Sequence, residues 1–319
     1  MLRVLYAGSP YFSARTLELL IAGGTASGFE IVGALTNPPR SQGRHKTLIP
    51  TPVHDCALQH GIPVIAPDRL DGAAREQVAA LRPDLLVCFA YGKIFGPQFL
   101  SLFRYGGVNL HPSLLPKYRG PTPVHAAIRN GDSETALTVQ TLSLKMDEGN
   151  ILAQKRVSLA GTETAGELLL SFAVDGVPLL CDVLVETAAH SALPVGTPQQ
   201  GAASYTTLFT KESARIDWSV SARTVDALIR SCTPEPGAWT ADERGGLNII
   251  RAHIAAESTP NGTRNEAGVV IDFIKDSGIL VATGDGVLCV TELQRHGKAV
   301  LSAQKFINGA RNFIGTKLH

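Results

Sequence analysis

The sequence predicts an α/β protein in which a doubly wound, mostly parallel sheet precedes a smaller C-terminal β-barrel. Over residues 1–189, short and nearly continuous apolar segments alternate with helical patterns, which is typical of a parallel sheet covered by helices on both faces. Residues 190–207 are rich in Pro, Gly, Ser and Gln and predict a linker. Residues 208–319 contain short strands separated by Gly, Asn and Asp, as expected of a small OB-like barrel.

Apolar spacing predicts the elements of the first domain. Helices are expected over residues 12–22 and about 163–189, where apolar residues recur at helical spacing. The expected strands are Leu2–Ala7, Glu30–Thr36, Ile62–Ile65, Asp84–Ala90, Gly107–His111 and Ala136–Leu142. Because such sheets bind ligands beyond the carboxyl ends of their strands, we expect a site near Gly8, Gly92 and His111.

The same reasoning places the elements of the second domain. One helix is expected over residues 219–231. Strands are expected over residues 247–255, 267–275, 278–284 and 286–293. Their short length and regular spacing favour an antiparallel arrangement.

Composition limits the class of protein. The hydrophobic fraction of 44% and the charged fraction of 18% are those of a globular protein, and the net charge of +1 predicts no general attraction to nucleic acid or membrane. The five cysteines are scattered and without CxxC spacing, so we expect neither a metal site nor a disulfide framework. The N-terminus reads as a strand rather than a signal peptide, and no apolar run approaches the roughly 20 residues that span a bilayer. We therefore expect a cytoplasmic protein with no membrane partner.

The first turn, Ala7-Gly8-Ser9-Pro10, follows a predicted strand and precedes a predicted helix, as in Rossmann-like domains. It lacks the GxGxxG spacing of dinucleotide sites, and Pro10 stands where a glycine is usual. We therefore expect a plain β-to-α turn in a Rossmann-like sheet, which disfavours an NAD-dependent oxidoreductase.

The candidate catalytic residues are Asn109, His111 and Asp147. Asn109 and His111 lie two apart on one predicted strand, so their side chains share a face, and His111 ends that strand. A loop bounded by prolines follows, and a second loop that carries Asp147 could fold back over it. An amide, an imidazole and a carboxylate together suit proton transfer beside a carbonyl that becomes an oxyanion. Asp147 could fix the His111 tautomer and favour its charged form, or act through water on an amine.

Two longer stretches carry a resemblance to a known family. NLHPSLLPKYRGPTPVHAAIRNGD, at residues 109–132, and LKMDEGNIL, at residues 144–152, resemble the formyltransferases that use 10-formyltetrahydrofolate. The Asn-x-His pair, the SLLP run and the later Asp are shared across that superfamily, so they do not identify the acceptor. The resemblance implies 10-formyltetrahydrofolate as co-substrate and no metal. It implies that the folate site is flanked by Ser113, Leu114, Leu115 and Pro116.

Three further stretches resemble methionyl-tRNA formyltransferases in particular, and the resemblance runs from Leu2 to about Arg311. Thr36–Pro52 is similar to that family's basic insertion, Ala214–Ser219 (ARIDWS) to the sequence after its linker, and Ala282–Leu293 with Gly297–Gln304 to the end of its C-terminal domain. This implies a charged initiator tRNA as partner, no DNA, and a monomer. The residues implied in phosphate contact near the tRNA acceptor end are Arg40, Arg44, His45 and Lys46.

Some features depart from the family pattern or bear on the choice of acceptor. Tyr118 stands where many relatives carry Trp, and Pro112 where many carry a small residue. Residues 208–319 hold 13 Lys and Arg against 12 Asp and Glu, so tRNA binding there would need cations such as Arg295, Lys298 and Lys305 on one face. The alternatives are a folate-dependent formyltransferase for an amino sugar or a purine precursor, and an RNA-binding module without catalysis. The intact Asn109, His111 and Asp147 argue against the last.

Overall fold

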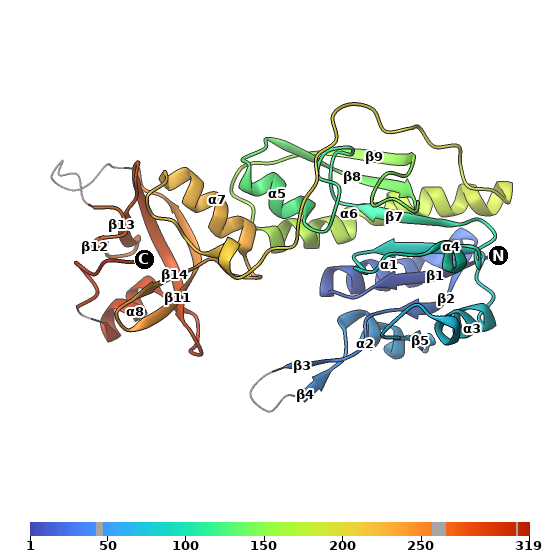
Figure 1. Cartoon of the computed structure of the whole chain (residues 1–319), viewed down its shortest axis with the longest axis horizontal. Coiled ribbons are helices and arrows are strands. Elements are labelled where there is room, and N and C mark those ends of the chain that lie inside the picture. Colours follow the sequence, from blue (N-terminus) through green and yellow to red (C-terminus); the bar gives the residue numbers. More distant parts are fainter. Residues whose placement is uncertain (43–46, 257–265, 311) are drawn as a thin grey trace. The chain divides into compact units, whose positions relative to one another are not determined.

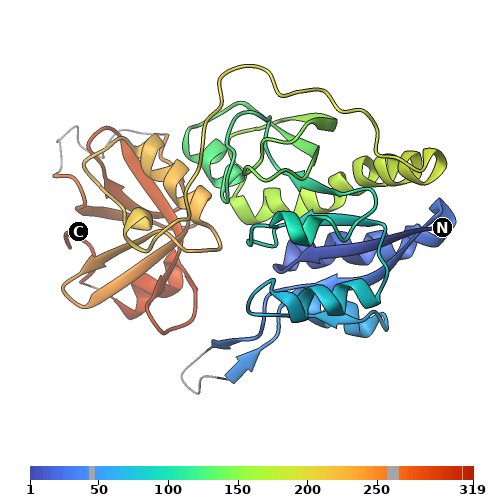
Figure 2. The ribbon, with the colours of Figure 1, turned by 45° about the vertical axis from the view of Figure 1, so that its right-hand side comes forward.

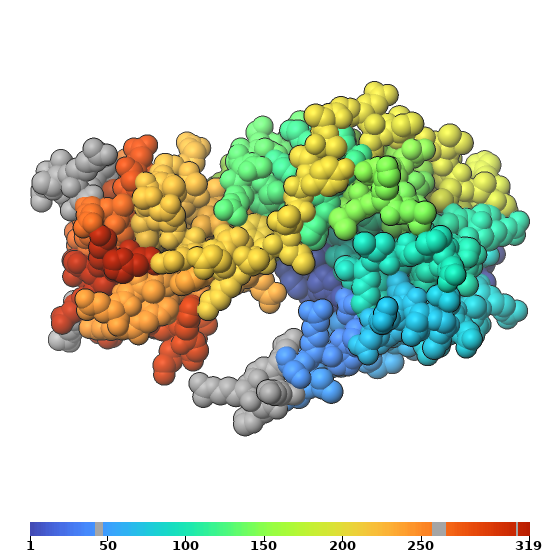
Figure 3. Space-filling view, in the orientation of Figure 1, coloured from blue at the N-terminus to red at the C-terminus, as the bar shows by residue number. Residues whose placement is uncertain are grey.

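The computed structural model describes residues 1–42, 47–256, 266–310 and 312–319, and the chain divides into two compact units (Figure 1). The first comprises Met1–Pro123, Glu134–Ser158 and Leu169–Thr207. The second comprises Val124–Ser133, Leu159–Leu168 and Leu208–His319. The second unit therefore combines two short segments from the middle of the chain with everything after residue 207, which Figure 3 colours from yellow to red.

A mixed sheet forms the centre of the first unit, in the strand order β5-β2-β1-β6-β7-β8-β9. Its strands are β1 (Leu2–Gly8), β2 (Phe29–Leu35), β5 (Val64–Ile65), β6 (Leu85–Phe89), β7 (Gly107–His111), β8 (Glu134–Thr141) and β9 (Ile151–Ser158). Pairing is parallel from β5 to β7 and antiparallel from β7 to β9. The predicted mostly parallel, Rossmann-like sheet is confirmed.

Helices cover both faces of this sheet, as the side-chain alternation along β1 shows. Leu5 packs into a core with Val78 of α3 and Phe99 of α4. Tyr6 points to the other face, where its hydroxyl donates to the carbonyl of Ser13 in α1 over 2.8 Å. The helices of this unit are α1 (Tyr11–Gly24), η1 (Thr25–Ser27), α2 (Pro52–Gln59), α3 (Gly72–Ala80), α4 (Pro97–Leu100) and the part of α6 (Ala165–His190) that follows Leu168. Helix α5 (Pro123–Arg129) belongs to the second unit except for its first residue.

Helix α6 is long and apolar enough to cross a membrane, although the sequence predicted no such segment. One such helix is weak support for a membrane span, because a core helix of a soluble protein has the same character. The part of α6 in the first unit packs against protein. Thr16 of α1 donates to the Ala173 carbonyl over 2.8 Å, and a side chain at Gly176 would meet Leu110 of β7 at 2.5 Å. The absence of a membrane partner stays a prediction.

Two short strands, β3 (Arg40–Gln42) and β4 (Thr47–Ile49), pair antiparallel within the predicted basic insertion (Figure 2). No strand is among those expected there from the sequence. Thr51 then caps α2 by accepting from the His54 backbone N–H, and Pro52 occupies the first helical position, where no donor is needed.

The second unit contains an antiparallel sheet in the order β10-β11-β14-β13-β12, with β15 paired to β14. Its core includes Trp218, Leu247, Val281 and Phe306. The strands are β10 (Trp239–Asp242), β11 (Gly245–Ile254), β12 (Val270–Ile274), β13 (Gly278–Ala282), β14 (Val287–Arg295) and β15 (Leu301–Ser302); the helical segments are η2 (Glu212–Ala214), α7 (Ala222–Cys232) and α8 (Ala303–Gly309). The predicted antiparallel C-terminal fold is confirmed as a curled half-barrel.

The tail at residues 315–319 bridges the two edges of this half-barrel. Beside β12, the Leu318 N–H donates to the Gly268 carbonyl over 2.8 Å. Beside β10, Ala241 and His319 exchange backbone hydrogen bonds of 3.1 and 2.9 Å. Backbone pairing through this tail therefore satisfies polar groups that an open sheet would leave at both edges.

Candidate active site

Strand β7 presents Asn109 and His111 on one face, as predicted. In register, Asn109 lies opposite Gln140 of β8 and Cys88 of β6, so both of its neighbouring strands fix its position. His111 is paired with Thr138 and is only 4% exposed. The imidazole is thus held in a largely dry setting at the end of the strand.

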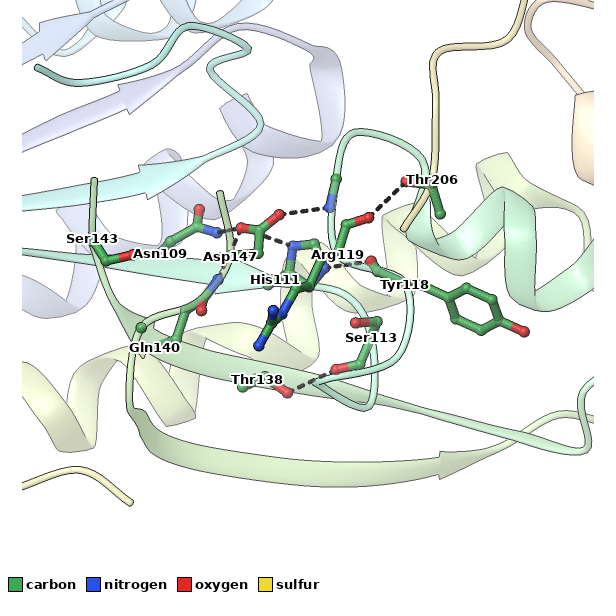
Figure 4. Close-up of polar contacts among 12 residues, drawn as sticks. Asn109, His111, Ser113, Tyr118, Arg119, Thr138, Gln140, Ser143, Asp147 and Thr206 are labelled. Atoms are coloured by element: carbon green, nitrogen blue, oxygen red, sulfur yellow. Dashed lines mark hydrogen bonds and ion pairs between the residues drawn. The ribbon is translucent and has the colours of Figure 1, made fainter. Parts of the chain in front are cut away.

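Asp147 lies in the loop between β8 and β9 and meets both of these side chains (Figure 4). Its Oδ1 lies 3.4 Å from Asn109 Nδ2 and 3.6 Å from His111 Nδ1. Gln140 donates to the same oxygen over 2.9 Å, and the Gly120 N–H donates to Oδ2 over 2.8 Å. The carboxylate therefore accepts from three N–H donors and also faces His111 Nδ1, and the three residues predicted from sequence lie together.

One hydrogen bond and one ion-pair contact of His111 restrict where its protons can be. Its Nε2 lies 2.9 Å from the carbonyl oxygen of Tyr118, which can only accept, so Nε2 carries a proton. Its Nδ1 faces the Asp147 carboxylate, so a doubly protonated ring would satisfy both contacts. The proton at Nδ1 is consequently the one that can be exchanged during a reaction.

Other titratable groups beside these strands are unsuited to proton transfer near neutral pH. Burial raises the pKa of the Cys88 thiol to about 12, and it also raises the pKa of the Tyr91 hydroxyl. Both side chains stay neutral and packed. Of the groups described at this edge of the sheet, the imidazole of His111 and the carboxylate of Asp147 remain as acid–base candidates.

The SLLP loop, Ser113–Pro116, folds onto the sheet. The Ser113 hydroxyl donates to the Lys117 carbonyl over 2.6 Å, and the Ser113 carbonyl accepts from Thr138 over 2.7 Å. Leu114 is partly exposed, whereas the other three side chains are buried. Any folate contact from this loop would therefore come from Leu114 or from backbone atoms, and the role of the loop stays a prediction.

The structure describes one of the four residues predicted to contact tRNA phosphates. Arg40 lies exposed on β3, whereas Arg44, His45 and Lys46 lie outside the described residues. Partial burial, together with the charge of Arg40, lowers the pKa of Lys93, which donates to the carbonyl of Pro67 over 2.7 Å. The carboxylate of Asp68 opposes this shift more strongly than Arg40 adds to it, so Lys93 lies in the field of both charges.

One predicted cation of the second unit already has a partner. Arg295 binds both carboxylate oxygens of Asp242, each over 2.5 Å. Burial alone would raise the pKa of the Asp242 carboxyl, but this ion pair lowers it. Lys298 and Lys305 are exposed. Arg295 is therefore a structural ion-pair residue rather than an uncommitted phosphate ligand.

Three groups at the site were missed from sequence: the Gly120 N–H, the Tyr118 carbonyl and the Gln140 amide. The first two are backbone atoms of a loop, which side-chain patterns do not report. Gln140 did leave a signal, because it is a polar residue inside the apolar strand ALTVQTL. Within the described residues, no group of His, Cys, Asp and Glu is arranged to hold a metal ion.

Two family models match the chain. One, described as formyl transferase, matches residues 2–184, and one described as formyl transferase, C-terminal domain, matches residues 209–311. The methionyl-tRNA formyltransferase of Treponema denticola is 39% identical over 98% of both chains, and that of Roseiflexus castenholzii is 39% identical over 99% of both. The chain belongs to the methionyl-tRNA formyltransferase family.

Solved structures with lower sequence identity to this chain share its fold. Methionyl-tRNA formyltransferase from Clostridium thermocellum matches with a TM-score of 0.57 and 17% identity, over 82% of this chain and 96% of that one. HypX from Aquifex aeolicus, solved in complex with tetrahydrofolic acid, matches with a TM-score of 0.65 and 14% identity. The match covers 98% of this chain and 48% of HypX, so the chain spans about half the length of that protein.

Proposed function

We propose that this protein transfers a formyl group from 10-formyltetrahydrofolate to the α-amino group of methionyl-tRNA, the initiator form, for translation initiation. The observation that carries the proposal is the convergence of Asn109, His111 and Asp147 at one strand end. The near full-length similarity to methionyl-tRNA formyltransferases supports the choice of acceptor over an amino sugar or a purine precursor.

Asn109 is assigned to the formyl oxygen. Attack of the amine on the formyl carbon places negative charge on that oxygen, and a preplaced N–H donor stabilises it. One N–H of the Asn109 amide faces Asp147, which leaves the second for the oxygen. Removing one such donor commonly lowers the rate by ~100- to 1,000-fold.

His111 and Asp147 are assigned to proton transfer. The amine must lose a proton and the departing nitrogen of the folate must gain one. The His111 Nε2 proton is held by the Tyr118 carbonyl, so the proton at Nδ1, beside Asp147, is the mobile one. Positioned acid–base groups typically contribute ~100- to 10,000-fold. In this arrangement the carboxylate stabilises the charged imidazole and orients it.

The two substrates are assigned to two separate sets of residues. Ser113, Leu114, Leu115 and Pro116 flank the folate, with contact through Leu114 and backbone atoms. Arg40, Arg44, His45 and Lys46 contact phosphates near the acceptor end of the tRNA. In this proposal residues 1–189 form the catalytic domain, 190–207 the linker and 208–319 the tRNA-binding domain of a cytoplasmic monomer.

The test is a formylation assay with purified protein and 10-formyltetrahydrofolate. Initiator methionyl-tRNA is compared with free methionine, amino sugars and methionyl-tRNA whose amino group is already acetylated. We expect product only from the tRNA with a free amino group. Equal formylation of free methionine or an amino sugar would contradict the assigned acceptor.

A further inference from the structure

A side chain from the segment before residue 208 reaches the loop that carries Asp147. The Nε2 of Gln199 donates to the carbonyls of Asp147 and Gly149 over 2.7 and 2.9 Å. The same atom lies 3.2 Å from Gln140 Oε1. Gln199 Oε1 accepts from Nε and Nη2 of Arg119 over 3.1 and 2.8 Å. One amide thus joins the loop backbone, a side chain on β8 and a guanidinium.

The loop depends on such polar contacts because its apolar side chains do not anchor it. Leu144 is 62% exposed and Met146 is 51% exposed. Asp147 itself has a φ of 54°, in the left-handed region that is uncommon outside glycine. A backbone in this conformation, without buried apolar neighbours in the loop, is held by the groups that bind its carbonyls and carboxylate.

Arg119, at one end of this network, determines which group donates and which accepts in each of its hydrogen bonds. Arg119 can only donate, so Gln199 must turn its oxygen toward the guanidinium and its NH2 toward Gln140. Gln140 then presents its oxygen to Gln199 and its NH2 to Asp147 Oδ1, over 2.9 Å. The relay therefore runs from an obligate donor to an obligate acceptor. Because the Gln199 NH2 has two hydrogens for three acceptors, its 3.2 Å contact with Gln140 is shared with a loop carbonyl.

We propose that Gln199 is a positioning residue for Asp147. Through the relay it keeps the Gln140 amide oriented toward the carboxylate, and through the loop carbonyls it keeps that carboxylate beside His111. The inference rests on the proposed function, because Gln199 acts only through Asp147. It assigns this role to a residue within the segment whose composition predicts a linker.

Two substitutions separate the parts of this role, with a matched control. Gln199→Leu keeps a side chain of similar size and removes the amide. Gln199→Glu can keep the contact with Arg119, but it places an acceptor where the relay needs a donor. The control is Gln200→Leu, because Gln200 is the same residue type, adjacent and exposed.

We expect both Gln199 variants to lower kcat by about 10- to 100-fold, since displacement of a catalytic group carries a cost of that size. The KM for methionyl-tRNA should stay unchanged, because a positioning role gives Gln199 no part in binding the substrate. A fall in kcat at constant KM separates positioning from a general structural defect, because only the former affects the reacting groups alone. Gln200→Leu should behave as wild type.

Wild-type kcat in folded Gln199 variants would overturn the inference. A loss of activity that follows thermal instability, with KM rising as kcat falls, would also overturn it and leave only a structural role. If Gln199→Leu fails to fold, Gln199→Glu carries the test. Asp147→Asn separates the two proposals: full activity there refutes the proposed catalytic site, whereas an inactive Asp147→Asn beside fully active Gln199 variants refutes positioning alone.

Discussion

Asp147→Asn is the sharpest perturbation of the site, because it removes one charge while the backbone can stay as it is. Asparagine tolerates the left-handed conformation that Asp147 adopts, at a φ of 54°. An Asn at this position has a single oxygen for donors that approach from two sides, Gly120 on Oδ2 and Gln140 on Oδ1. Whichever way the amide turns, its NH2 opposes a donor.

The magnitudes follow from those contacts. A buried donor left without an acceptor costs about 1–3 kcal/mol, so the free energy of unfolding should fall by that amount. His111 also loses its negative partner, and we expect kcat to fall about 100- to 10,000-fold. Chemical denaturation and single-turnover formylation of initiator methionyl-tRNA measure the two effects. The control is Asp276→Asn, an exposed aspartate with a φ of 64°. Wild-type kcat in a folded Asp147→Asn would refute the reasoning.

Three other predictions concern separate parts of the chain. His111→Ala should lower kcat sharply while the fold is kept, and a folded variant with wild-type turnover would contradict its assignment. Arg44→Ala should raise the KM for tRNA and reduce the salt dependence of binding, because each phosphate contact releases counterions; an unchanged slope would remove this residue from the interface. Burial lowers the pKa of His125 to about 4. As pH falls below about 6.5, the unfolded chain binds a proton at His125 before the folded chain does. The free energy of unfolding should therefore fall by about 2 kcal/mol between about pH 7 and about pH 5. In denaturant titrations, the free energy of unfolding of His125→Phe should fall less over that range.

Local patterns were sufficient to predict the elements that carry the site. The strand expected at Gly107–His111 is observed with the same bounds, and the helix expected over about 163–189 is observed at Ala165–His190. Period-two alternation was also enough to place Asn109 and His111 on one face. These features depend on residues close in sequence, which is why composition and spacing report them.

The surroundings of Asp147 could not be predicted in the same way. Its partners Gly120 and Gln199 lie 27 and 52 residues away in sequence, and each contact uses a backbone atom on one side. The segment 190–207 is polar and has no apolar periodicity, so its composition resembles that of a free linker. Residues such as Thr197 and Tyr205 nevertheless form β-bridges within the first unit. A segment held by hydrogen bonds rather than by burial leaves no pattern in hydropathy.

The segments that make up the second unit determine when it can fold during translation. It includes residues made early, such as Gly166, whose N–H donates to the carbonyl of Thr233 over 2.9 Å. It also needs Leu318 and His319 to pair with both edges of the half-barrel. Domains generally fold as units while the chain leaves the ribosome. Most of the first unit is made before the barrel strands are synthesised. The second unit cannot be completed until residues 315–319 have been made. Truncated translation products would therefore leave the edges of the half-barrel open to association.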